Sequence, residues 1–455
     1  EIPLRLVGSE MCIRDRSTYL SALRTAEAYT GMKMGVTKAL KKVPKVGTAL
    51  VDTMRKTKSS VKQLFIPGML FENMGLTYLG PVDGHNMRQM MKLFNEAKRV
   101  EGPVVVHVLT KKGRGYEPAS AHPDRFHGTG PFDIKTGRVL QKKTVPGYTD
   151  VFSKALVSLG EKNKKLTAIT AAMPDGTGLV EFSRRFPDRF FDVGIAEEHA
   201  VSFAAGLALG GLVPVVAIYS SFLQRAVDQI LHDVCMQKLH VIFAVDRAGL
   251  VGADGETHQG CFDLSYLSMM PNMTVLAPKN DRELEEMLAF AVSFDGPIAI
   301  RYPRGSAHQG LQEYQAPVEY GRSEIIRKGK KIAVLGVGSM IPSCMEICKG
   351  LKDDGYDPTF VNVRFVKPLD VDLLDELAKD HSLFVTVEEN VKSGGYGEHV
   401  SAYMEACHPE IRVLSAAVWD RFVPQGNVES LRSRIGLGVE DIRQAIEDSE
   451  ELREQ

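Results

Sequence analysis

A carboxylate at the start of an apolar helix is the first feature of this sequence that could do chemistry. The run from Phe191 to Ala200 predicts a strand end that turns into a helix of small apolar residues, and Glu197 falls at the start of that helix. Burial disfavours the ionised form of a carboxyl group, so an unpaired Glu197 would be costly, whereas a ligand nitrogen that shares its proton would make the group useful. The structural alternative is a first-turn acid that the helix dipole stabilises.

Further polar groups follow apolar runs that predict buried strands. The loop from Asp246 to Gly260 is rich in glycine and too polar for a core, and it carries Arg247, Asp254 and His258. Arginine holds phosphate well, and histidine and aspartate can move protons near a carbonyl group. An arginine after a strand is usually a surface residue, but several such segments at strand ends favour a ligand site. The other segments of this kind are Tyr219 to Arg225 and Arg301 to Gly305.

The elements that must position these residues belong to an α/β fold. Short apolar, β-branched runs alternate with longer helical patterns, which predicts parallel sheets with crossover helices. The strand candidates are too numerous for a single sheet. They are Pro103 to Leu109, Leu166 to Thr170, Val213 to Tyr219, Val241 to Val245, Thr274 to Ala277, Ile298 to Arg301, Ile332 to Leu335, Thr359 to Val363, Leu383 to Val387 and Val413 to Ala417.

Length and composition limit the class of protein. A chain of 455 residues is too long for one core, and 44% hydrophobic with 25% charged residues is typical of a water-soluble protein. The net charge of −1 offers no general attraction for nucleic acid, and no apolar run is long enough to cross a membrane. The six cysteines show no metal-binding spacing, which favours reduced thiols in a cytosolic protein. We expect a cytoplasmic location in a bacterium. Residues 1–16 show no periodicity that joins the segment after them, which predicts a leader that is foreign to the fold. Breaks near 142–147 and 310–321 predict domains at 17–142, 148–315 and 316–455.

From Ser17 to Gln455 the sequence resembles the 1-deoxy-D-xylulose-5-phosphate synthase family of transketolase-like enzymes. The Asp246 to Gly260 loop and the run from Arg301 to Gly305 are its most specific matches, and both separate this family from other transketolase-like enzymes. The resemblance implies three doubly wound domains of transketolase type, of which the first is incomplete. The remaining matches are Ser17 to Leu20, Gly80 to His85, Thr110 to Ala119 and Ile195 to His199.

The resemblance also implies a cofactor, two substrates and roles for particular residues. Family members use thiamine diphosphate with Mg²⁺ and act as homodimers. They condense pyruvate with D-glyceraldehyde 3-phosphate and release CO₂, which is the first step of an isoprenoid pathway and also feeds thiamine synthesis. By resemblance Glu197 would bond the pyrimidine nitrogen N1′ of the cofactor. Phe222 would stack on that ring, and Tyr116 would line the cofactor site. Tyr219, Arg247 and Arg304 would orient the sugar phosphate, while Asp254, His258 and His127 would lie near the reacting carbons.

One segment imitates the magnesium motif of this class, which is Gly-Asp-Gly followed by an asparagine about 30 residues later. Here Gly252, Ala253, Asp254 and Gly255 precede Asn280, but the alanine spoils the triplet and Asn280 is an ordinary helix-cap candidate. We therefore predict no metal site within this chain. We expect the magnesium ligands in the family segment that precedes the position of Ser17, where this chain has sixteen unrelated residues.

That difference leaves alternatives open. The parent protein is expected to be a thiamine-diphosphate-dependent transferase, whereas this chain by itself could be inactive. A fragment that binds a partner or a sugar phosphate without turnover is one alternative, and another transketolase-like activity is the second. Release of CO₂ from pyruvate in the presence of glyceraldehyde 3-phosphate discriminates between these possibilities.

Overall fold

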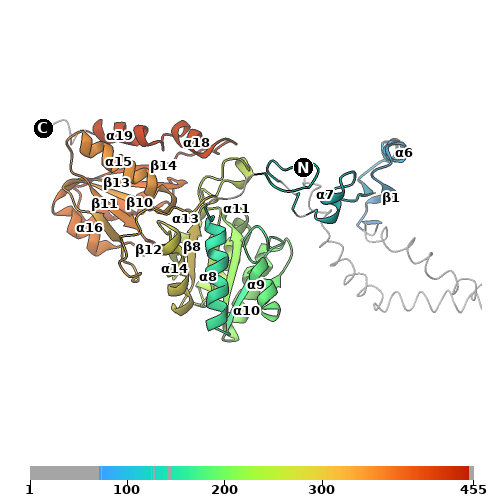
Figure 1. Cartoon of the computed structure of the whole chain (residues 1–455), viewed down its shortest axis with the longest axis horizontal. Helices are drawn as coiled ribbons and strands as arrows, with labels where there is room; N and C mark the ends of the chain where they lie inside the picture. Colours follow the sequence, from blue (N-terminus) through green and yellow to red (C-terminus); the bar gives the residue numbers. More distant parts are fainter. Residues whose placement is uncertain (1–70, 73, 124, 127–128, 141–144, 450–455) are drawn as a thin grey trace, which may run out of the picture. The chain divides into compact units, whose positions relative to one another are not determined.

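The computed structural model describes residues 71–72, 74–123, 125–126, 129–140 and 145–449. The chain divides into two compact units, Glu1–Lys142 and Lys143–Gln455. In the described part of the first unit, strands β1 (Thr77–Asp83) and β2 (Val104–Leu109) pair in parallel, with helix α6 (Met87–Ala97) between them in the sequence. Helix α7 (Glu117–Ala121) follows β2 (Figure 1).

The second unit contains a seven-stranded sheet in the order β12-β7-β8-β6-β5-β3-β4. All its neighbouring strands run parallel except β12, which pairs antiparallel with β7 at one edge. The strands are β3 (Leu166–Thr170), β4 (Phe190–Asp192), β5 (Val213–Tyr219), β6 (Ile242–Asp246), β7 (Thr274–Leu276), β8 (Ile298–Tyr302) and β12 (Phe365–Lys367).

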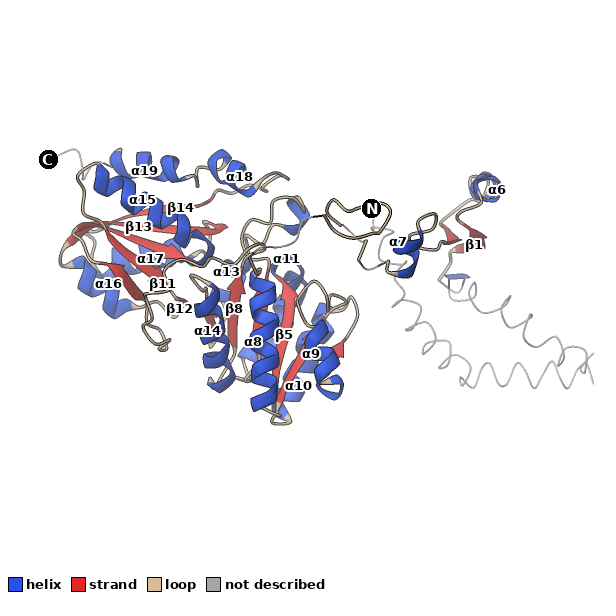
Figure 2. Cartoon of the chain, viewed as in Figure 1, coloured by secondary structure: helices blue, strands red, loops and turns tan. Residues whose placement is uncertain are grey.

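Alternate residues of these strands bury their side chains on opposite faces of the sheet, because successive side chains of a strand point to opposite sides. Leu166, Val215 and Ile242 pack in one core with α8 (Tyr148–Lys162) and α14 (Asp281–Ser293). Val216 and Phe243 pack in the other core with α10 (Glu197–Leu209). Figure 2 shows α8 on one face of this sheet, running alongside β5 and β8. Helices therefore cover both faces, which confirms the doubly wound α/β fold for this part. The remaining short elements are α9 (Val180–Arg185), η2 (Pro187–Arg189), α11 (Ser220–Leu223), η3 (Gln224–Ala226), α12 (Val227–Gln229), η4 (Ile230–Cys235), η5 (Glu256–His258) and α13 (Asp263–Ser268).

A second sheet of five strands has the order β14-β13-β10-β11-β9, with β9 antiparallel at its edge. Its strands are β9 (Glu324–Arg327), β10 (Lys331–Val337), β11 (Thr359–Val363), β13 (His381–Val391) and β14 (Arg412–Val418). The helices of this region are η6 (Gly338–Met340), α15 (Ile341–Asp353), α16 (Val371–Ala378), α17 (Tyr396–Cys407), α18 (Val428–Arg434) and α19 (Val439–Glu447). The chain leaves β10 toward β11 and later returns to β13 on the other side of β10. The sheet therefore has a topological switch point between β10 and β13.

A buried ionic cluster connects the two sheets of the second unit. Glu283 on α14 accepts hydrogen bonds from the Lys279 ammonium at 2.9 Å and from Arg364 Nε at 2.7 Å. Glu324 on β9 binds the same two cations, at 2.7 Å and 3.2 Å. All four residues are at most 6% exposed. Arg364 lies between β11 of one sheet and β12 of the other, so this cluster fixes the crossing of the chain between the sheets.

Glu388 makes the stability of the second sheet depend on pH. The carboxylate lies fully buried on β13 and accepts the backbone N–H groups of Tyr396 and Gly397 at 2.9 Å and 2.8 Å. Burial raises the pKa of Glu388 to about 7, against these two hydrogen bonds. Between its unfolded and folded pKa values the folded state binds more protons, so the free energy of unfolding falls as pH rises through this window.

We therefore expect Glu388→Gln to gain stability relative to the parent protein as pH rises from about 4.5 to 7. The relative gain across this window should approach about 3 kcal/mol, because each pKa unit corresponds to about 1.4 kcal/mol. Urea unfolding at several pH values measures this difference. A difference that stays constant with pH would show that Glu388 does not titrate in this range.

Candidate active site

The carboxyl ends of the parallel strands bring the predicted segments to one edge of the seven-stranded sheet. Tyr219 ends β5 and Asp246 ends β6, and the two are directly paired across the sheet. Arg304 follows β8, and Glu197 begins α10 shortly after β4. The chain passes from β3 to β4 on one side and to β5 on the other, so this edge also contains a topological switch point. Ligands of open α/β sheets bind at such points.

Glu197 is buried and has a partner that the sequence analysis did not assign. The residue is 2% exposed, and its Oε1 lies 2.5 Å from Nη1 of Arg225. The Arg225 side chain is 46% exposed, and its guanidinium carbon lies 5.5 Å from the ring centroid of Phe222. Arg225 belongs to the polar segment from Tyr219 to Arg225 that the sequence analysis identified. The spacing of the two residues in the sequence does not predict that Arg225 pairs with Glu197. The carboxylate is therefore buried and carries an ion pair.

Aromatic rings lie next to this ion pair. The rings of Tyr219 and Phe222 stack with centroids 5.3 Å apart, and His258 approaches Phe222 edge-on at 5.4 Å. Burial raises the pKa of Tyr219 to about 12, so its phenol stays protonated at neutral pH. The fold therefore brings Glu197, Phe222, Tyr219 and His258 together, with Arg225 and Phe222 linking the carboxylate to the rings.

Arg247 is held in a strained backbone conformation by its neighbours. Its φ angle of 59° is in the left-handed region, which is uncommon for a residue with a side chain and is often associated with functional sites. The guanidinium carbon lies 3.7 Å from the Tyr219 ring centroid, and Nη1 donates to Gly176 O at 3.1 Å. Asp246 lies 3.3 Å from the guanidinium and accepts a bond from Thr149 Oγ1 at 2.8 Å. Burial raises the pKa of Asp246 to about 6, and Arg247 opposes that rise.

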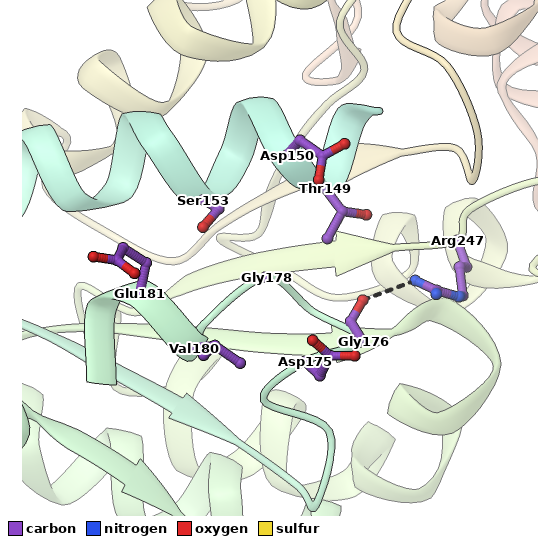
Figure 3. Close-up of a pocket in the computed structure, with 9 residues that line it drawn as sticks. All are labelled: Thr149, Asp150, Ser153, Asp175, Gly176, Gly178, Val180, Glu181 and Arg247. Atoms are coloured by element: carbon purple, nitrogen blue, oxygen red, sulfur yellow. Dashed lines mark hydrogen bonds between the residues drawn. The ribbon is translucent and has the colours of Figure 1, made fainter. Parts of the chain in front are cut away.

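A cavity of about 430 Å³ opens beside Arg247 between α8 and the loop that follows β3 (Figure 3). In Figure 3 the Arg247 guanidinium lies at one end of the cavity and reaches the Gly176 carbonyl. A Cβ atom at Gly176 would lie 2.0 Å from the Tyr219 hydroxyl oxygen, so this position requires glycine. Three carboxylates line the cavity and disfavour an anion there. They belong to Asp150, Asp175 and Glu181.

Among the remaining polar residues predicted in the second unit, some lie at the site and others are buried in the core. Asp254 forms an ion pair with Arg304 at 2.9 Å, and both side chains are partly exposed. Arg301, by contrast, is 2% exposed and binds Asp263 through two nitrogens, at 2.6 Å and 3.2 Å. Of the two guanidinium groups in the run from Arg301 to Gly305, that of Arg304 is therefore partly exposed and that of Arg301 is buried. The Arg301 side chain stabilises the core.

Asp254 and Asn280, the two residues that imitate a magnesium motif, form other interactions in the structure. The side chain of Asn280 accepts the Glu283 N–H at 2.9 Å as the cap of α14, and its amide donates to Gly310 O at 2.9 Å. Asp254 is occupied by Arg304. In the part of the chain that the structure describes, no group of three or more His, Cys, Asp or Glu side chains is placed to hold a metal ion.

Two predicted residues belong to the first unit. Tyr116 is half-buried, donates its hydroxyl proton to Ile134 O at 2.8 Å and packs near Phe126 and Phe132. His127 lies outside the described residues. The roles of Tyr116 and His127 stay predictions.

Comparisons with known proteins agree with this geometry. Residues 145–309 match the family model "Transketolase, pyrimidine binding domain", and residues 321–442 match "Transketolase, C-terminal domain". A solved chain described as a split-gene transketolase in an inactive beta4 tetramer is 31% identical, with a TM-score of 0.60 over 67% of this chain and 98% of that one. A transketolase from Campylobacter jejuni, 17% identical with a TM-score of 0.57, covers 84% of this chain and 68% of that one and shares the fold. The fold is thus that of the transketolase class.

Within that class a narrower assignment follows. Residues 11–110 match the family model "1-deoxy-D-xylulose-5-phosphate synthase". A protein of that name from Lachnoclostridium phytofermentans is 54% identical over 94% of this chain and 68% of its own length. Another from Natranaerobius thermophilus is 49% identical over the same shares. The chain belongs to the 1-deoxy-D-xylulose-5-phosphate synthase family, as the sequence motifs predicted.

Across the described residues, no helix combines the length and the apolar character that crossing a membrane requires.

Proposed function

We propose that this chain carries the catalytic carboxylate and the sugar-phosphate site of a thiamine-diphosphate-dependent 1-deoxy-D-xylulose-5-phosphate synthase. The reaction condenses pyruvate with D-glyceraldehyde 3-phosphate and releases CO₂. The buried Glu197 beside Phe222, at the switch point of a transketolase-type sheet, is the observation that carries this proposal. Thiamine diphosphate would supply the carbon nucleophile and the electron sink that decarboxylation needs.

The residues around Glu197 fit the pyrimidine end of that cofactor. A carboxyl group with 2% exposure can share a proton with a ring nitrogen, because the site offers little water as a competing partner. Phe222 presents an aromatic face on which a flat heterocycle can stack. Arg225 is paired with the Glu197 carboxylate at 2.5 Å. When a ring nitrogen binds, the carboxylate would exchange part of this contact with Arg225 for a hydrogen bond to that nitrogen. Tyr116 is also proposed to line a cofactor site, as the resemblance implies.

The guanidinium groups fit the phosphate of the aldehyde substrate. Arg247 and Arg304 supply planar donors of the kind that match phosphate oxygens, and the protonated hydroxyl of Tyr219 adds a neutral donor. Asp254 and His258 are proposed to bind and move protons near the reacting carbons, together with His127. Asp254 orients Arg304 through their ion pair at 2.9 Å.

The proposal includes a magnesium ion. We expect the ion to accompany the cofactor diphosphate, with ligands outside the described residues.

The proposal also includes a second subunit. Helix α10 consists mainly of small apolar residues after its first turn, yet Gly206 and Leu209 are exposed there, with Leu209 at 66%. An apolar helix of this kind is normally buried, which supports a homodimer that covers this face. Sedimentation analysis of the purified chain measures its oligomeric state.

Turnover with defined substrates tests the function directly. We expect release of CO₂ from pyruvate that depends on glyceraldehyde 3-phosphate, thiamine diphosphate and Mg²⁺, with formation of 1-deoxy-D-xylulose 5-phosphate. The assay should use this chain and a version extended by a family-type N-terminal segment. Activity in the extended version alone would assign the missing function to that segment. A folded extended protein that consumes other ketose and aldose phosphates instead would favour another transketolase-like activity.

A non-catalytic chain is the second candidate. The solved split-gene transketolase chain that aligns with 67% of this chain is described as inactive. Calorimetry separates this candidate from the first, because a non-catalytic chain that binds sugar phosphate would show binding heat without turnover in either version.

Replacing Arg247 by methionine is expected to raise KM for glyceraldehyde 3-phosphate about 10- to 100-fold, with a smaller effect on kcat. The estimate corresponds to the loss of one charge-assisted interaction worth about 1.5–3 kcal/mol. Steady-state kinetics with varied aldehyde at saturating pyruvate provides the measurement. Arg185→Met is the matched control, since Arg185 pairs with Glu161 on the surface and should leave KM unchanged. Equal effects of the two substitutions would contradict the role of Arg247.

A further inference from the structure

The loop at 246–260 carries Asp254 and His258, which are proposed to act near the reacting carbons, and its two ends are joined. Gly249 and Gly260 exchange both backbone hydrogen bonds, at 2.7 Å and 2.8 Å, and so form the base of the loop. Asp254 and His258 lie beyond this base, in the tip. Catalytic groups on a loop need a rigid support, because a displacement of about 1 Å can cost about 100-fold in rate.

Gln259 makes contacts that fix this tip. Its side chain is only 3% exposed, although glutamine is mostly found at protein surfaces. The Oε1 atom accepts the Val251 N–H at 2.8 Å and the Gly252 N–H at 3.4 Å. The amide group of the same side chain donates to the Pro424 carbonyl oxygen at 3.1 Å. One buried side chain therefore binds both the loop and a segment 165 positions further along the chain.

The distant segment also contacts the loop through its backbone. Pro424 and Gly426 lie between β14 and α18, in the part of the chain that forms the second sheet. The Gly426 N–H donates to Gly252 O at 3.3 Å. A Cβ atom at Gly252 would lie 2.7 Å from the Gly426 carbonyl oxygen, so the two backbones approach closely. The loop therefore rests directly against the segment that follows β14.

Other contacts join the two sheet regions without involving the loop tip. Ser265 on α13 donates its hydroxyl proton to Ser393 O at 2.6 Å and accepts a bond from the Asn390 amide at 2.8 Å. The ionic cluster around Glu283 connects the two sheets as well. The packing of the two regions therefore does not depend on Gln259 alone, whereas the contacts of Gln259 act on the loop itself.

We infer that Gln259 is a positioning residue for the proposed reaction. It holds the loop tip against the segment that follows β14, so that Asp254 and His258 keep one geometry toward the reacting carbons. Gln259 acts through these two residues, since its own polar atoms bind backbone groups. The second sheet region thereby takes part in catalysis and not only in packing. This inference rests on the roles proposed above for Asp254 and His258.

Steady-state kinetics of Gln259→Met tests the inference in whichever version of the chain supports turnover. Methionine keeps a long, flexible side chain but removes the hydrogen bonds to Val251 and Pro424. We expect kcat to fall about 10- to 100-fold, while Kd for thiamine diphosphate and KM for pyruvate change less than about threefold. An unchanged kcat, or an equal loss of kcat and of cofactor affinity, would overturn the positioning role.

Two further variants separate positioning from packing. Gln259→Asn keeps the amide but shortens the side chain by one methylene group, so it should lower kcat in the same direction. Ser265→Ala is the control, because it removes hydrogen bonds between the same two regions away from the loop. Its kcat should stay within about twofold of the parent value. Thermal unfolding confirms that each variant is folded. A loss of kcat in Ser265→Ala equal to that in Gln259→Met would contradict a specific role of Gln259.

Hydrogen exchange measured by mass spectrometry tests the same inference without turnover. Peptides that cover 250–258 should exchange about tenfold faster in Gln259→Met, because the Val251 and Gly252 N–H groups lose their acceptor. The same peptides should be unaffected in Ser265→Ala. Unchanged exchange in Gln259→Met would overturn the inference. If neither version of the parent protein releases CO₂, the proposed function fails, and the exchange result still decides whether Gln259 fixes the loop.

Discussion

Replacement of Glu197 by glutamine is expected to lower the rate of CO₂ release from pyruvate by a factor on the order of 1,000. General acid–base groups contribute about 100- to 10,000-fold, and an amide cannot share a proton with a ring nitrogen as a carboxyl group can. Steric effects should be small, because glutamine has nearly the same shape. The measurement uses whichever version of the chain supports turnover, at saturating cofactor and substrates.

The neighbouring residue supplies the control for this prediction. Glu198 is exposed on the first turn of the same helix, so Glu198→Gln removes one negative charge from the helix start without touching the buried pocket. Its activity should stay within about twofold of the parent protein. Binding of thiamine diphosphate, measured by calorimetry, gives a second readout for Glu197→Gln. If both variants lose activity equally, the loss would come from an electrostatic effect at the helix start and not from a proton relay by Glu197.

The second large effect is expected at the ionic cluster between the two sheets. Glu283→Gln should lower the free energy of unfolding by about 3–5 kcal/mol, because it leaves buried cations without full compensation. Glu283 accepts from Arg364 Nε, Lys279 Nζ and the amide of Asn362. Glu324 alone would then face both Lys279 and Arg364. Urea unfolding at neutral pH, followed by circular dichroism, measures the change.

A matched substitution on the same helix tests whether the loss of stability depends on the burial of the charge. Glu286 pairs with Arg282 at 2.8 Å, but both side chains are partly exposed, at 34% and 40%. Exposed pairs of this spacing contribute about 0.3–0.5 kcal/mol, so Glu286→Gln should change stability very little. A loss of less than about 1 kcal/mol for Glu283→Gln would mean that water or neighbouring groups compensate the buried cations.

The sequence by itself determined the α/β fold and most of its strands. Every strand candidate lies within or next to an observed strand, and Leu166–Thr170, Val213–Tyr219 and Thr359–Val363 have the predicted bounds. Buried parallel strands appear in a sequence as continuous β-branched runs. Such a strand can therefore be recognised from its own residues, without knowing which strands lie beside it. The same local signal placed Glu197 at a helix start and Tyr219 at a strand end. Strands β1, β9 and β12 were not among the candidates. Strand β12 has three residues and β9 has four, which are too few to show a pattern.

Only the tertiary structure decided which polar residues share a site. Arg301 and Arg304 are three positions apart, yet one is buried against Asp263 and the other is partly exposed beside Asp254. The pairing of Glu197 with Arg225 joins residues 28 positions apart, and that of Asp246 with Thr149 joins residues 97 positions apart. A periodic pattern reports how deeply a segment is buried. The partner of a buried charge depends instead on which segments the folded chain brings together, and no local pattern specifies this.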